Sequence, residues 1–426
     1  MNKEEILVVR KNGPLKGEVY ISGAKNSALP ILAASLLATE EVILDEVPKL
    51  KDIRVMVEIL RSLNAKVEYI TETSLRIDSS KVDKFETPFE LMDKMRASFI
   101  AMGPLLARFG HAITKAPGGC NIGKRPIDLH LKGFEALGAE TVMNHEEISS
   151  KAKNGLKGSV IYLDFPSVGA TENIMMAATM AEGETVIENA AKEPEIVDLA
   201  SFLSKMGANI IGAGTSNIII KGVERLKGTR HTIVPDRIEA ATYMLAAAIT
   251  GGDILVKNVL GSHIRPVIAK LIEIGAQVEE IEDEDMIRVK ASKRLKSTSI
   301  KTLPYPGFPT DVQSQFMALM TVCNGESSVV ETVFENRFMH VDELKKMGAA
   351  IITEGNRAVI VGVDKLHGAE VKATDLRAGA ALILAGLVAE GETKISDIYH
   401  IDRGYSYLIE KFTKLGALIE RKQVNE

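Results

Sequence analysis

The stretch Met206-Gly207-Ala208-Asn209-Ile210-Ile211 shows the pattern on which the whole chain is built, because it joins a helix-like segment to a strand-like one. Glycine at a helix end adopts left-handed backbone angles at little cost, and the β-branched run after it favours a strand. The same junction recurs at intervals of about 70 residues, which is the mark of an internal repeat. The other five copies are Leu63-Asn64-Ala65, Leu137-Gly138-Ala139, Ile274-Gly275-Ala276, Met347-Gly348-Ala349 and Leu415-Gly416-Ala417.

Each copy holds two helix-like segments of different character. The first is rich in Ala, Leu and Met on all sides, as in residues 173–180, 237–249 and 378–388, and a helix of that kind must be buried. The second carries apolar residues at helical spacing, as in residues 53–63 and 194–206. Short turns and strand-like runs join the two. The sequence therefore predicts a mixed α/β fold in which the apolar helices gather in threes, giving two lobes of three copies each.

Length and composition set the broad class of protein. At 426 residues, the chain exceeds what one hydrophobic core usually organises, and we expect an N-terminal lobe of residues 23–232 and a C-terminal lobe of residues 1–22 plus 233–426. A formal net charge of -5 argues against a nucleic-acid partner. Two cysteines are too few for a disulfide framework. No apolar run is long enough for a membrane span and no signal-peptide pattern is present, so we predict a cytoplasmic protein.

A loop of residues 115–128 surrounds Cys120 with glycines, prolines and three cations, Lys115, Lys124 and Arg125. Nearby positive charge would lower the pKa of the thiol below its free value of about 8.5. Such a thiol can donate a proton or attack an electrophile, and an arginine beside it can grip a phosphate or a carboxylate. The alternative is that Cys120 is an inert small residue in a glycine turn whose cations are simply solvated.

Two helix starts, at residues 21–27 and 167–173, combine Gly-Ala with polar side chains. Exposed N–H groups and the positive end of a helix favour anions, and Lys25 would add a full charge. The alternative at both places is ordinary capping of the helix by a hydroxyl or amide side chain. The candidate caps are Ser22, Ser27, Thr171 and Asn173.

Three single residues, Arg96, Asp311 and Arg377, also stand directly before apolar segments. An arginine at a helix start opposes the helix dipole unless an anion compensates it, so we expect Arg96 and Arg377 to contact a ligand. Taken alone, Asp311 is better explained as a helix cap. The segments 335–340 and 400–405 each hold an Arg and a His without metal-ligand spacing, and we predict no metal site.

Several segments together resemble those of a known family, and they span the whole chain in order. They are Gly23-Ala24-Lys25-Asn26, Met95-Arg96-Ala97-Ser98, the run from Pro117 to His130, Ser167-Val168-Gly169-Ala170-Thr171, Pro306-Gly307-Phe308-Pro309-Thr310-Asp311, Glu335-Asn336-Arg337-Phe338 and Asp402-Arg403-Gly404-Tyr405. They are similar to the motifs of the UDP-N-acetylglucosamine 1-carboxyvinyltransferases, which are enolpyruvyl transferases. The cysteine loop is the most specific of them, because the related enolpyruvylshikimate-phosphate synthases lack it.

The resemblance implies a fold and an activity. The family fold is a two-lobed, inside-out α/β barrel of six βαβαββ-type repeats, with the active site in the cleft between the lobes. The implied reaction transfers enolpyruvyl from phosphoenolpyruvate to the 3'-hydroxyl of UDP-N-acetylglucosamine and releases phosphate, as the first committed step of peptidoglycan synthesis. The expected partners are these two small molecules, with no cofactor, metal or membrane; the sequence leaves the oligomeric state open.

The resemblance also implies roles for single residues. Cys120 is expected to protonate phosphoenolpyruvate, to form a covalent adduct with it and to be the target of fosfomycin, while Asp311 becomes the base that contacts the 3'-hydroxyl. Lys25 and Arg403 complete the expected catalytic set. The phosphoenolpyruvate contacts are expected to be Lys25, Asn26, Cys120, Arg125, Arg337, Arg377 and Arg403. The sugar-nucleotide contacts are expected to be Asn26, Arg96, Arg125, Pro126, Ile127, Asp128, Leu129, Ser167, Val168, Gly169, Asp311 and Val333.

One position departs from the family pattern. Some members carry a lysine two places before the serine of the Ser-Val-Gly-Ala-Thr motif, where it meets the nucleotide phosphates, and this chain has Phe165 there. The diphosphate contact must then come from Arg125 or from the backbone of residues 167–169. Two other functions stay open: an enolpyruvyl transferase for another alcohol such as shikimate 3-phosphate, and a non-enzymatic scaffold of repeats.

Overall fold

The computed structural model describes residues 4–116, 127–291 and 294–424. They divide into two compact units, which are treated separately throughout: an N-terminal unit of residues 23–116 and 127–234, and a C-terminal unit of residues 4–22, 235–291 and 294–424. The second crossing of the chain between units falls after Val234, whereas the sequence placed it after residue 232. The segment before the first repeat, residues 4–22, lies in the C-terminal unit.

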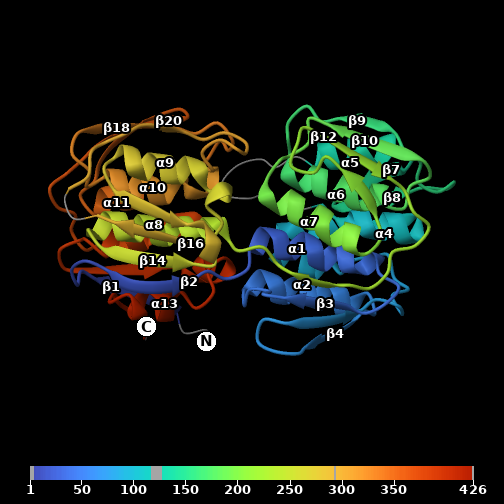
Figure 1. Ribbon diagram of the computed structural model, residues 1–426, viewed down its shortest axis with the longest axis horizontal. Coiled ribbons are helices and arrows are strands. Elements are labelled where there is room, and N and C mark those ends of the chain that lie inside the picture. Colours follow the sequence, from blue (N-terminus) through green and yellow to red (C-terminus); the bar gives the residue numbers. More distant parts are fainter. Residues whose placement is uncertain (1–3, 117–126, 292–293, 425–426) are drawn as a thin grey trace. The chain divides into compact units, whose positions relative to one another are not determined.

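The N-terminal unit contains helices and short strands in alternation (Figure 1). Its helices are α1 (Lys25–Ala34), α2 (Lys51–Ser62), α3 (Phe89–Lys94), α4 (Met102–Phe109), α5 (Asp128–Ala136), α6 (Val168–Ala178) and α7 (Pro194–Lys205), with 3-10 helices η1 (Ser35–Leu37) and η2 (Arg96–Ala101). Its strands are β3 (Val42–Asp45), β4 (Lys66–Tyr69), β5 (Leu75–Asp78), β6 (His111–Lys115), β7 (Glu140–Asn144), β8 (Glu147–Lys151), β9 (Val160–Tyr162), β10 (Glu184–Glu188), β11 (Asn209–Ile211), β12 (Asn217–Lys221) and β13 (Arg230–Thr232).

The C-terminal unit is built in the same way. Its helices are α8 (Arg237–Thr250), α9 (Arg265–Glu273), α10 (Gln313–Met320), α11 (His340–Lys346), α12 (Leu376–Gly386) and α13 (Leu408–Lys414), with 3-10 helices η3 (Gly261–His263), η4 (Glu282–Glu284), η5 (Thr310–Val312) and η6 (Ile398–Arg403). Its strands are β1 (Glu4–Arg10), β2 (Lys16–Tyr20), β14 (Asp253–Lys257), β15 (Gln277–Ile281), β16 (Met286–Lys290), β17 (Ile300–Lys301), β18 (Glu326–Val330), β19 (Ala350–Glu354), β20 (Arg357–Val361), β21 (Glu370–Lys372), β22 (Glu392–Ser396) and β23 (Leu418–Val424).

The sheets repeat one topology, which confirms the internal repeat. Each four-stranded sheet has one parallel pair at an edge and antiparallel pairing elsewhere, as in β13-β3-β5-β4 and β9-β10-β12-β11. The three-stranded sheet β6-β8-β7 gains a parallel bridge between Glu86 and Ile113 where the others have their parallel strand. Strands from the start of the chain complete sheets of the C-terminal unit: β2 pairs with β14, and β1 lies between β22 and β23.

The six predicted helix ends all have left-handed backbone angles. The values of φ are 74° at Asn64, 90° at Gly138, 109° at Gly207, 101° at Gly275, 90° at Gly348 and 94° at Gly416. A side chain with a Cβ is strained in this region, which explains why five of the six positions are glycine and the sixth is asparagine. The junction motif from which the repeat was recognised is therefore a structural requirement of each helix-to-strand turn.

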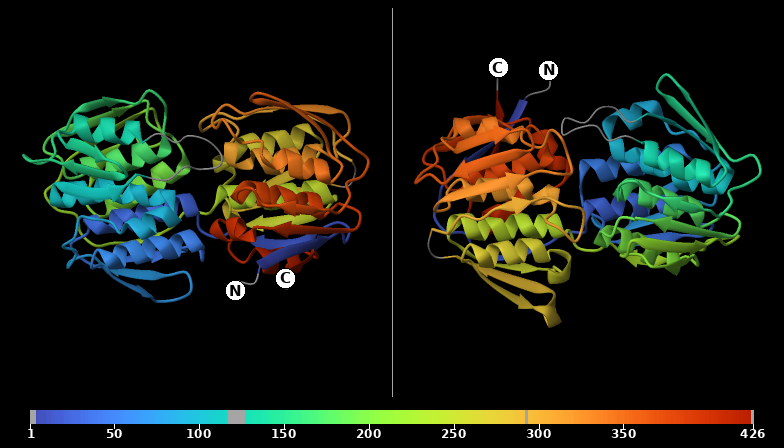
Figure 2. Two further views of the ribbon diagram at one scale, coloured as in Figure 1. Left: turned by 180° about the vertical axis from the view of Figure 1, so that it is seen from behind. Right: turned by 90° about the horizontal axis from the view of Figure 1, so that it is seen from above.

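The apolar helices form the core of each unit, as their composition predicts. Every residue of α10 is buried, and so is almost every residue of α8 and α12, which contact one another inside the C-terminal unit. In the N-terminal unit α1, α4 and α6 are the buried helices. The sheets and the amphipathic helices cover them, as the views of Figure 2 show for each unit.

The start of α6 differs from the expectation that the helix begins near Asn173. The helix begins at Val168, because the Ser167 hydroxyl caps it by accepting a hydrogen bond from the amide of Ala170 at 3.3 Å. Gly169 and Thr171 interrupt the apolar pattern without interrupting the helix. The cap Ser167 and the first two helical residues, Val168 and Gly169, are thus the residues expected to contact the sugar nucleotide.

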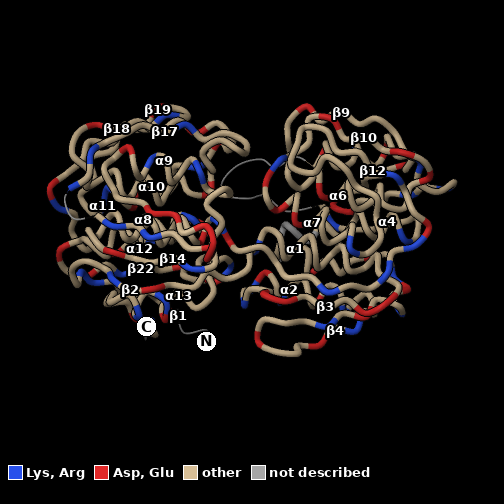
Figure 3. Tube along the Cα trace, in the orientation of Figure 1, with Lys and Arg blue, Asp and Glu red and all other residues tan. Residues whose placement is uncertain are grey.

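Charged residues of both signs are interspersed over each unit in the view of Figure 3. This distribution agrees with the small net charge of -5. Within residues 4–116, 127–291 and 294–424, no helix combines the length and hydropathy needed to cross a bilayer.

Candidate active site

The structure places the expected site residues in two clusters, one in each unit. Cys120, Arg125 and Pro126 lie outside the described residues, and so does the side chain of Arg96, whose backbone begins η2. The other candidates are described below by unit. Cys323, the second cysteine, is buried, and burial raises the pKa of its thiol to about 12, so it is not a reactive group.

In the C-terminal unit, three expected residues meet directly. The two carboxylate oxygens of Asp311 accept one hydrogen bond each, from Nη2 of Arg337 and Nη2 of Arg377, both at 2.8 Å. The arginine side chains are 3% and 5% exposed, whereas that of Asp311 is 26% exposed and so stays accessible. Asp311 does not cap α10, which corrects the role suggested by its position alone; its carboxylate instead compensates two buried cations.

The charges of this cluster are strongly coupled. Burial, the largest single effect, lowers the pKa of Arg377, but the charge of Asp311, followed by those of Tyr405 and Asp236 and by the hydrogen bond to Asp311, together raise the pKa above the ordinary value. Both arginines keep unused donors: Nη1 of Arg377 and Nε of Arg337 are buried and have no hydrogen-bond partner among the residues that the structure describes. An unsatisfied buried guanidinium donor is costly, so these atoms mark a place where an anionic ligand gains hydrogen bonds.

The backbone at Asp311 is held by a second set of buried polar groups. The side-chain nitrogen Nε2 of Gln315 donates to the backbone carbonyl oxygen of Asp311 at 2.9 Å and lies 3.2 Å from the hydroxyl of Tyr405. That hydroxyl lies 2.9 Å from the Thr242 hydroxyl. Sequence reasoning assigned no role to these three residues. The signal was the polar run Gln313-Ser314-Gln315 at the start of an otherwise apolar helix.

Glu331 connects the expected contact Val333 to the segment that carries Asp311. One oxygen of the Glu331 carboxylate accepts from the Val333 amide at 2.8 Å, and the other accepts from the Thr310 hydroxyl at 2.9 Å. Glu331 is 2% exposed. The buried carboxylate therefore fixes the loop of Val333 against the residue that precedes Asp311.

Arg403 lies half-buried at the end of η6, which packs against α12, the helix of Arg377. The close fit depends on Gly379, since a Cβ there would lie 2.5 Å from a side-chain carbon of Ile401. Burial, and then the charge of Arg403, lower the pKa of His400. The fold thus brings the elements of Arg377 and Arg403 together, as expected for residues of one site.

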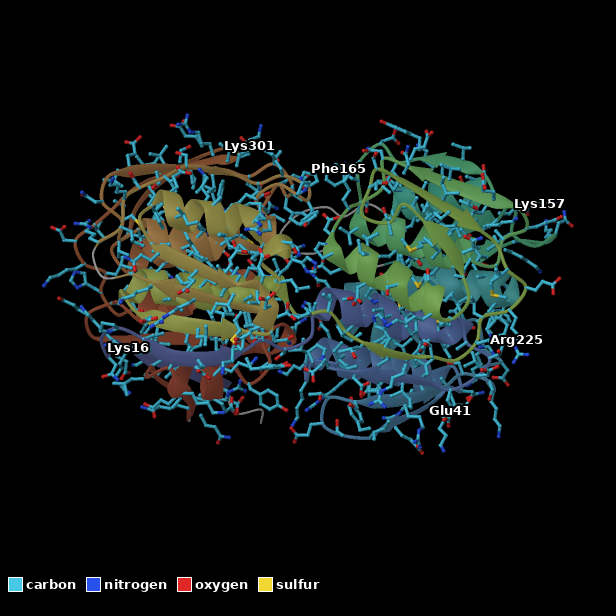
Figure 4. The ribbon with its side chains drawn as sticks, in the orientation of Figure 1. Lys16, Glu41, Lys157, Phe165, Arg225 and Lys301 are labelled. Atoms are coloured by element: carbon cyan, nitrogen blue, oxygen red, sulfur yellow. The ribbon has the colours of Figure 1, made fainter. Side chains whose placement is uncertain are left out.

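In the N-terminal unit, the starts of α5 and α6 meet. Ile127, Asp128 and Leu129 form the entry into α5, and the next residue, His130, contacts Gly169 near the start of α6: a Cβ on Gly169 would lie 3.2 Å from its imidazole. The expected contacts 127–129 and 167–169 are therefore neighbours. Phe165, labelled in Figure 4, precedes α6 and is 43% exposed.

The imidazole of His130 provides an uncharged hydrogen-bond donor, Nε2–H, near the start of α6. Oδ1 of Asn173 accepts from the Gly103 amide at 2.7 Å and Nδ2 donates to the Phe99 carbonyl at 3.2 Å, which fixes the orientation of the amide. Nδ2 then also donates to Nδ1 of His130 at 2.9 Å, so the imidazole proton sits on Nε2. Burial lowers the pKa of His130 to about 4, which keeps the ring uncharged near neutral pH.

Lys25 begins α1 and lies 3.4 Å from the Asp52 carboxylate; their side chains are 13% and 5% exposed. The N-cap residue of α1, Ala24, makes no side-chain hydrogen bond to the helix. The alternative of capping by Ser22 or Ser27 is therefore not what the described residues show at this helix end. The Ser27 hydroxyl instead donates to Asp198, a residue that also bonds to His231. Asn26 is half-buried in the first turn of α1.

The chemistry of the two clusters is that of binding anions and moving protons. The C-terminal cluster offers a partly exposed carboxylate between cations, and the N-terminal cluster offers helix N-termini, Lys25 and a neutral imidazole donor. Among the described residues, no group of His, Cys, Asp or Glu side chains is arranged to hold a metal ion.

Comparison with known proteins places this fold and these residues in one class. The model of the EPSP synthase (3-phosphoshikimate 1-carboxyvinyltransferase) family matches residues 9–412, and the chain belongs to that family of enolpyruvyl transferases.

Within the family, the chain is most informatively compared with two relatives. It is 68% identical to the UDP-N-acetylglucosamine 1-carboxyvinyltransferase of Finegoldia magna over 422 residues, 99% of this chain and 100% of the relative. It is 55% identical to the UDP-N-acetylglucosamine 1-carboxyvinyltransferase 1 of Staphylococcus aureus over 417 residues, 97% and 99% of the two chains. The resemblance inferred from the motifs is thereby confirmed.

Solved structures confirm the fold. The enolpyruvyl transferase NikO from Streptomyces tendae superposes with a TM-score of 0.89 at 24% identity, over 99% of this chain and 100% of that one. EPSP synthase from Acinetobacter baumannii gives a TM-score of 0.77 at 19% identity, with the same coverage. The two-lobed enolpyruvyl transferase fold of six repeats is thus the fold of this chain.

Proposed function

We propose that this chain transfers enolpyruvyl from phosphoenolpyruvate to the 3'-hydroxyl of UDP-N-acetylglucosamine, releasing phosphate, and so begins peptidoglycan synthesis. The observation that most directly supports this proposal is the 55–68% identity, over nearly the whole chain, to relatives named UDP-N-acetylglucosamine 1-carboxyvinyltransferase. The proposal includes a cytoplasmic location, because both substrates are charged phosphate esters that do not cross a lipid bilayer unaided.

The proposed chemistry needs one proton removed and one proton delivered. As the acceptor oxygen bonds to C2 of phosphoenolpyruvate, its proton passes to a base and C3 takes a proton from an acid; loss of phosphate and of a C3 proton then restores the double bond. We assign the base to Asp311, whose carboxylate is 26% exposed between two buried arginines. We assign the acid to Cys120, which lies outside the described residues.

The cations of the C-terminal unit are proposed to hold phosphoenolpyruvate. Arg377 and Arg337 already neutralise Asp311 and still have buried donors without partners, which supports a role in binding a second anion. Lys25, Arg125 and Arg403 are proposed to share the phosphate and carboxylate of the same substrate. Withdrawing an arginine donor from Asp311 toward the substrate would also make the carboxylate a stronger base.

The sugar nucleotide is proposed to bind at the starts of α5 and α6. The amide groups at the start of α6 and Nε2–H of His130 are donors for a diphosphate, and they compensate for the missing lysine at Phe165. The other proposed contacts are Asn26, Arg96, Arg125, Pro126, Asp128, Leu129, Asp311 and Val333.

A coupled phosphate-release assay tests the proposal. Phosphate should appear when phosphoenolpyruvate is supplied with UDP-N-acetylglucosamine and should not appear with shikimate 3-phosphate. The second acceptor is a necessary comparison because the family model is described by that reaction. Phosphate release with shikimate 3-phosphate alone would replace the proposed acceptor, and release with neither would favour a non-enzymatic scaffold.

Fosfomycin and a cysteine variant test the assignment of the acid. Fosfomycin should abolish phosphate release and add one inhibitor mass to the intact protein, and the Cys120→Ser variant should take up no inhibitor. Cys323→Ser is the matched control, because its thiol is buried with a pKa raised to about 12. Normal phosphate release by Cys120→Ser would remove this residue from the acid role.

A further inference from the structure

Tyr405 ends a buried chain of hydrogen bonds whose direction can be deduced atom by atom. The Thr242 hydroxyl lies 3.0 Å from the carbonyl oxygen of Ile238, which can only accept, so this hydroxyl donates there. Its oxygen therefore accepts the proton of the Tyr405 hydroxyl, 2.9 Å away. Because the Tyr405 hydroxyl donates its proton to Thr242, its oxygen can act only as a hydrogen-bond acceptor toward its other neighbours.

Those neighbours belong to the candidate active site. Nε2 of Gln315 donates to the Asp311 carbonyl at 2.9 Å and has a second proton for the Tyr405 oxygen at 3.2 Å. The orientation of this amide is fixed, because the Asp311 carbonyl can only accept a hydrogen bond; Oε1 on the other side of the amide then accepts from the Ser314 hydroxyl at 2.9 Å. The Asp311 backbone is thus tied through one side chain to the Tyr405 hydroxyl.

Arg377 approaches Tyr405 from the other direction. The guanidinium carbon lies 5.8 Å from the centroid of the Tyr405 ring, and Nη2 of the same arginine bonds to Oδ2 of Asp311. Burial raises the pKa of the Tyr405 hydroxyl, and the positive charge of Arg377 opposes that rise without cancelling it. Tyr405 therefore stays a neutral phenol that lies beside Arg377 and is linked to the Asp311 backbone through Gln315.

We propose that Tyr405 is a positioning residue for the reaction: through Gln315 its hydroxyl fixes the backbone of Asp311, while its ring lies beside Arg377, the partner of the Asp311 carboxylate. This inference rests on the proposed roles of Asp311 and Arg377. Tyr405, Gln315 and Thr242 are 5%, 0% and 1% exposed, so none of them is expected to contact a substrate. The hydroxyl acts through Gln315 on Asp311, which is proposed to contact the substrate.

The chain offers a matched control in Tyr243. This tyrosine lies in the same unit, is 0% exposed and packs on Phe412 with ring centroids 4.9 Å apart, but within the described part of the chain its hydroxyl has no hydrogen-bond partner. Tyr243→Phe and Tyr405→Phe therefore make the same chemical change in the same core. They differ in whether the lost hydroxyl belongs to the hydrogen-bond chain.

The test measures kcat and both KM values by phosphate release for the full chain and the two variants. Tyr405→Phe should lower kcat/KM for phosphoenolpyruvate about 10- to 100-fold, as expected for loss of fixed geometry, and leave KM for UDP-N-acetylglucosamine within about twofold. Tyr243→Phe should leave all three parameters within about twofold of the wild type. Adding Gln315→Met to Tyr405→Phe should cost little more, because residues that act as one unit are not additive.

Several results would overturn the inference. Equal kinetics of the two tyrosine variants would show that the hydroxyl of Tyr405 has no special role, and equal changes in both KM values would indicate a general loss of packing. Fully additive effects of Tyr405→Phe and Gln315→Met would break the proposed chain. In all these cases the wild type still releases phosphate, whereas a wild type inactive with UDP-N-acetylglucosamine would overturn the proposed function itself.

Discussion

The cluster around Asp311 and the cluster around His130 both lie at the start of a buried helix, yet the first is a set of ion pairs and the second is centred on a neutral imidazole. In the C-terminal unit a carboxylate is held between two arginines that are 3% and 5% exposed. In the N-terminal unit a neutral imidazole, oriented by Asn173, stands beside Gly169 in the first turn of α6. The same repeat thus carries two kinds of polar cluster, one charged and one centred on a neutral ring.

The difference follows from what each cluster must do when no ligand is bound. Buried arginines need a counter-charge at all times, and Asp311 supplies it, so an incoming anion rearranges an ion pair that already exists. Neutral donors and helix N-termini carry no such requirement and can await an anion without one. Mutations that change the charge of one cluster but keep its shape should therefore have unequal effects in the two units.

The largest effect is expected from Asp311→Asn, which keeps the shape of the side chain but removes its charge and basicity. Phosphate release should fall about 10²- to 10⁴-fold, the usual contribution of a general base. The matched control is Asp364→Asn in the same unit, where an 89% exposed carboxylate pairs with Arg294 at 2.5 Å. Near-normal turnover of Asp311→Asn would exclude it as the base.

The neutral imidazole of His130 should make the free energy of unfolding depend on pH. The pKa of His130 is lowered from 6.5 to about 4, so between these pH values the unfolded chain binds a proton that the folded chain does not. This contribution to the free energy of unfolding is complete above pH 6.5 and is lost as pH falls toward 4; it amounts to about 3 kcal/mol.

Denaturant unfolding between pH 4 and pH 7 measures this contribution. His130→Asn has no titrating ring and should lose about 3 kcal/mol less than the wild type over the interval. His367→Asn, at an exposed position on the other unit, serves as control. Parallel stability curves for wild type and His130→Asn would contradict the neutral, buried imidazole.

His130→Asn should also weaken binding of the sugar nucleotide. The asparagine can still accept from Asn173 but has no donor in the place of Nε2, so KM for UDP-N-acetylglucosamine should rise about tenfold, with kcat little changed. His111→Asn is the control, because Nε2 of His111 already bonds to Ser149 at 3.1 Å within its own sheet. A change in kcat alone would place His130 in the chemistry and not in binding.

The smallest effect is expected when a charge is added to the neutral cluster. Phe165→Lys restores the lysine of other family members before α6, and KM for UDP-N-acetylglucosamine should fall about two- to fivefold at low salt, as for an exposed ion pair. The gain should disappear at about 0.5 M salt. Tyr162→Lys, at a 53% exposed position on β9, should give no such gain. A lower KM that persists at high salt would show that Phe165 acts by its shape.

The sequence predicted those features that depend on neighbours along the chain. Glycine at Gly207 and asparagine at Asn64 follow from local backbone angles, and the apolar composition of α8 and α12 follows from burial on all sides. These local rules were enough for the repeat, the two lobes and the helix positions. They failed at the start of α6, where Ser167 caps a first turn without an apolar pattern.

The candidate site was predictable only in part, because its geometry depends on distant partners. Asp311 has no local feature that reveals its pairing with Arg337 and Arg377, which lie 26 and 66 residues further along the chain. The role of Gln315 depends on Tyr405, 90 residues away. Motifs predicted the ligand contacts, whereas the buried groups that orient the predicted residues follow from the folded structure.

The position of β1 has a consequence for the synthesis of the protein. This strand, Glu4–Arg10, lies between β22 and β23, and Arg10 bonds to Glu392 across 382 residues of chain. At about 5–20 residues per second, a ribosome takes roughly 20–80 s to make that interval. The unit of residues 23–234 is completed within it, while an apolar Ile6-Leu7-Val8-Val9 strand waits unpaired. The charges that flank this strand, Glu4, Glu5 and Arg10, are of the kind that keeps a nascent strand from aggregating.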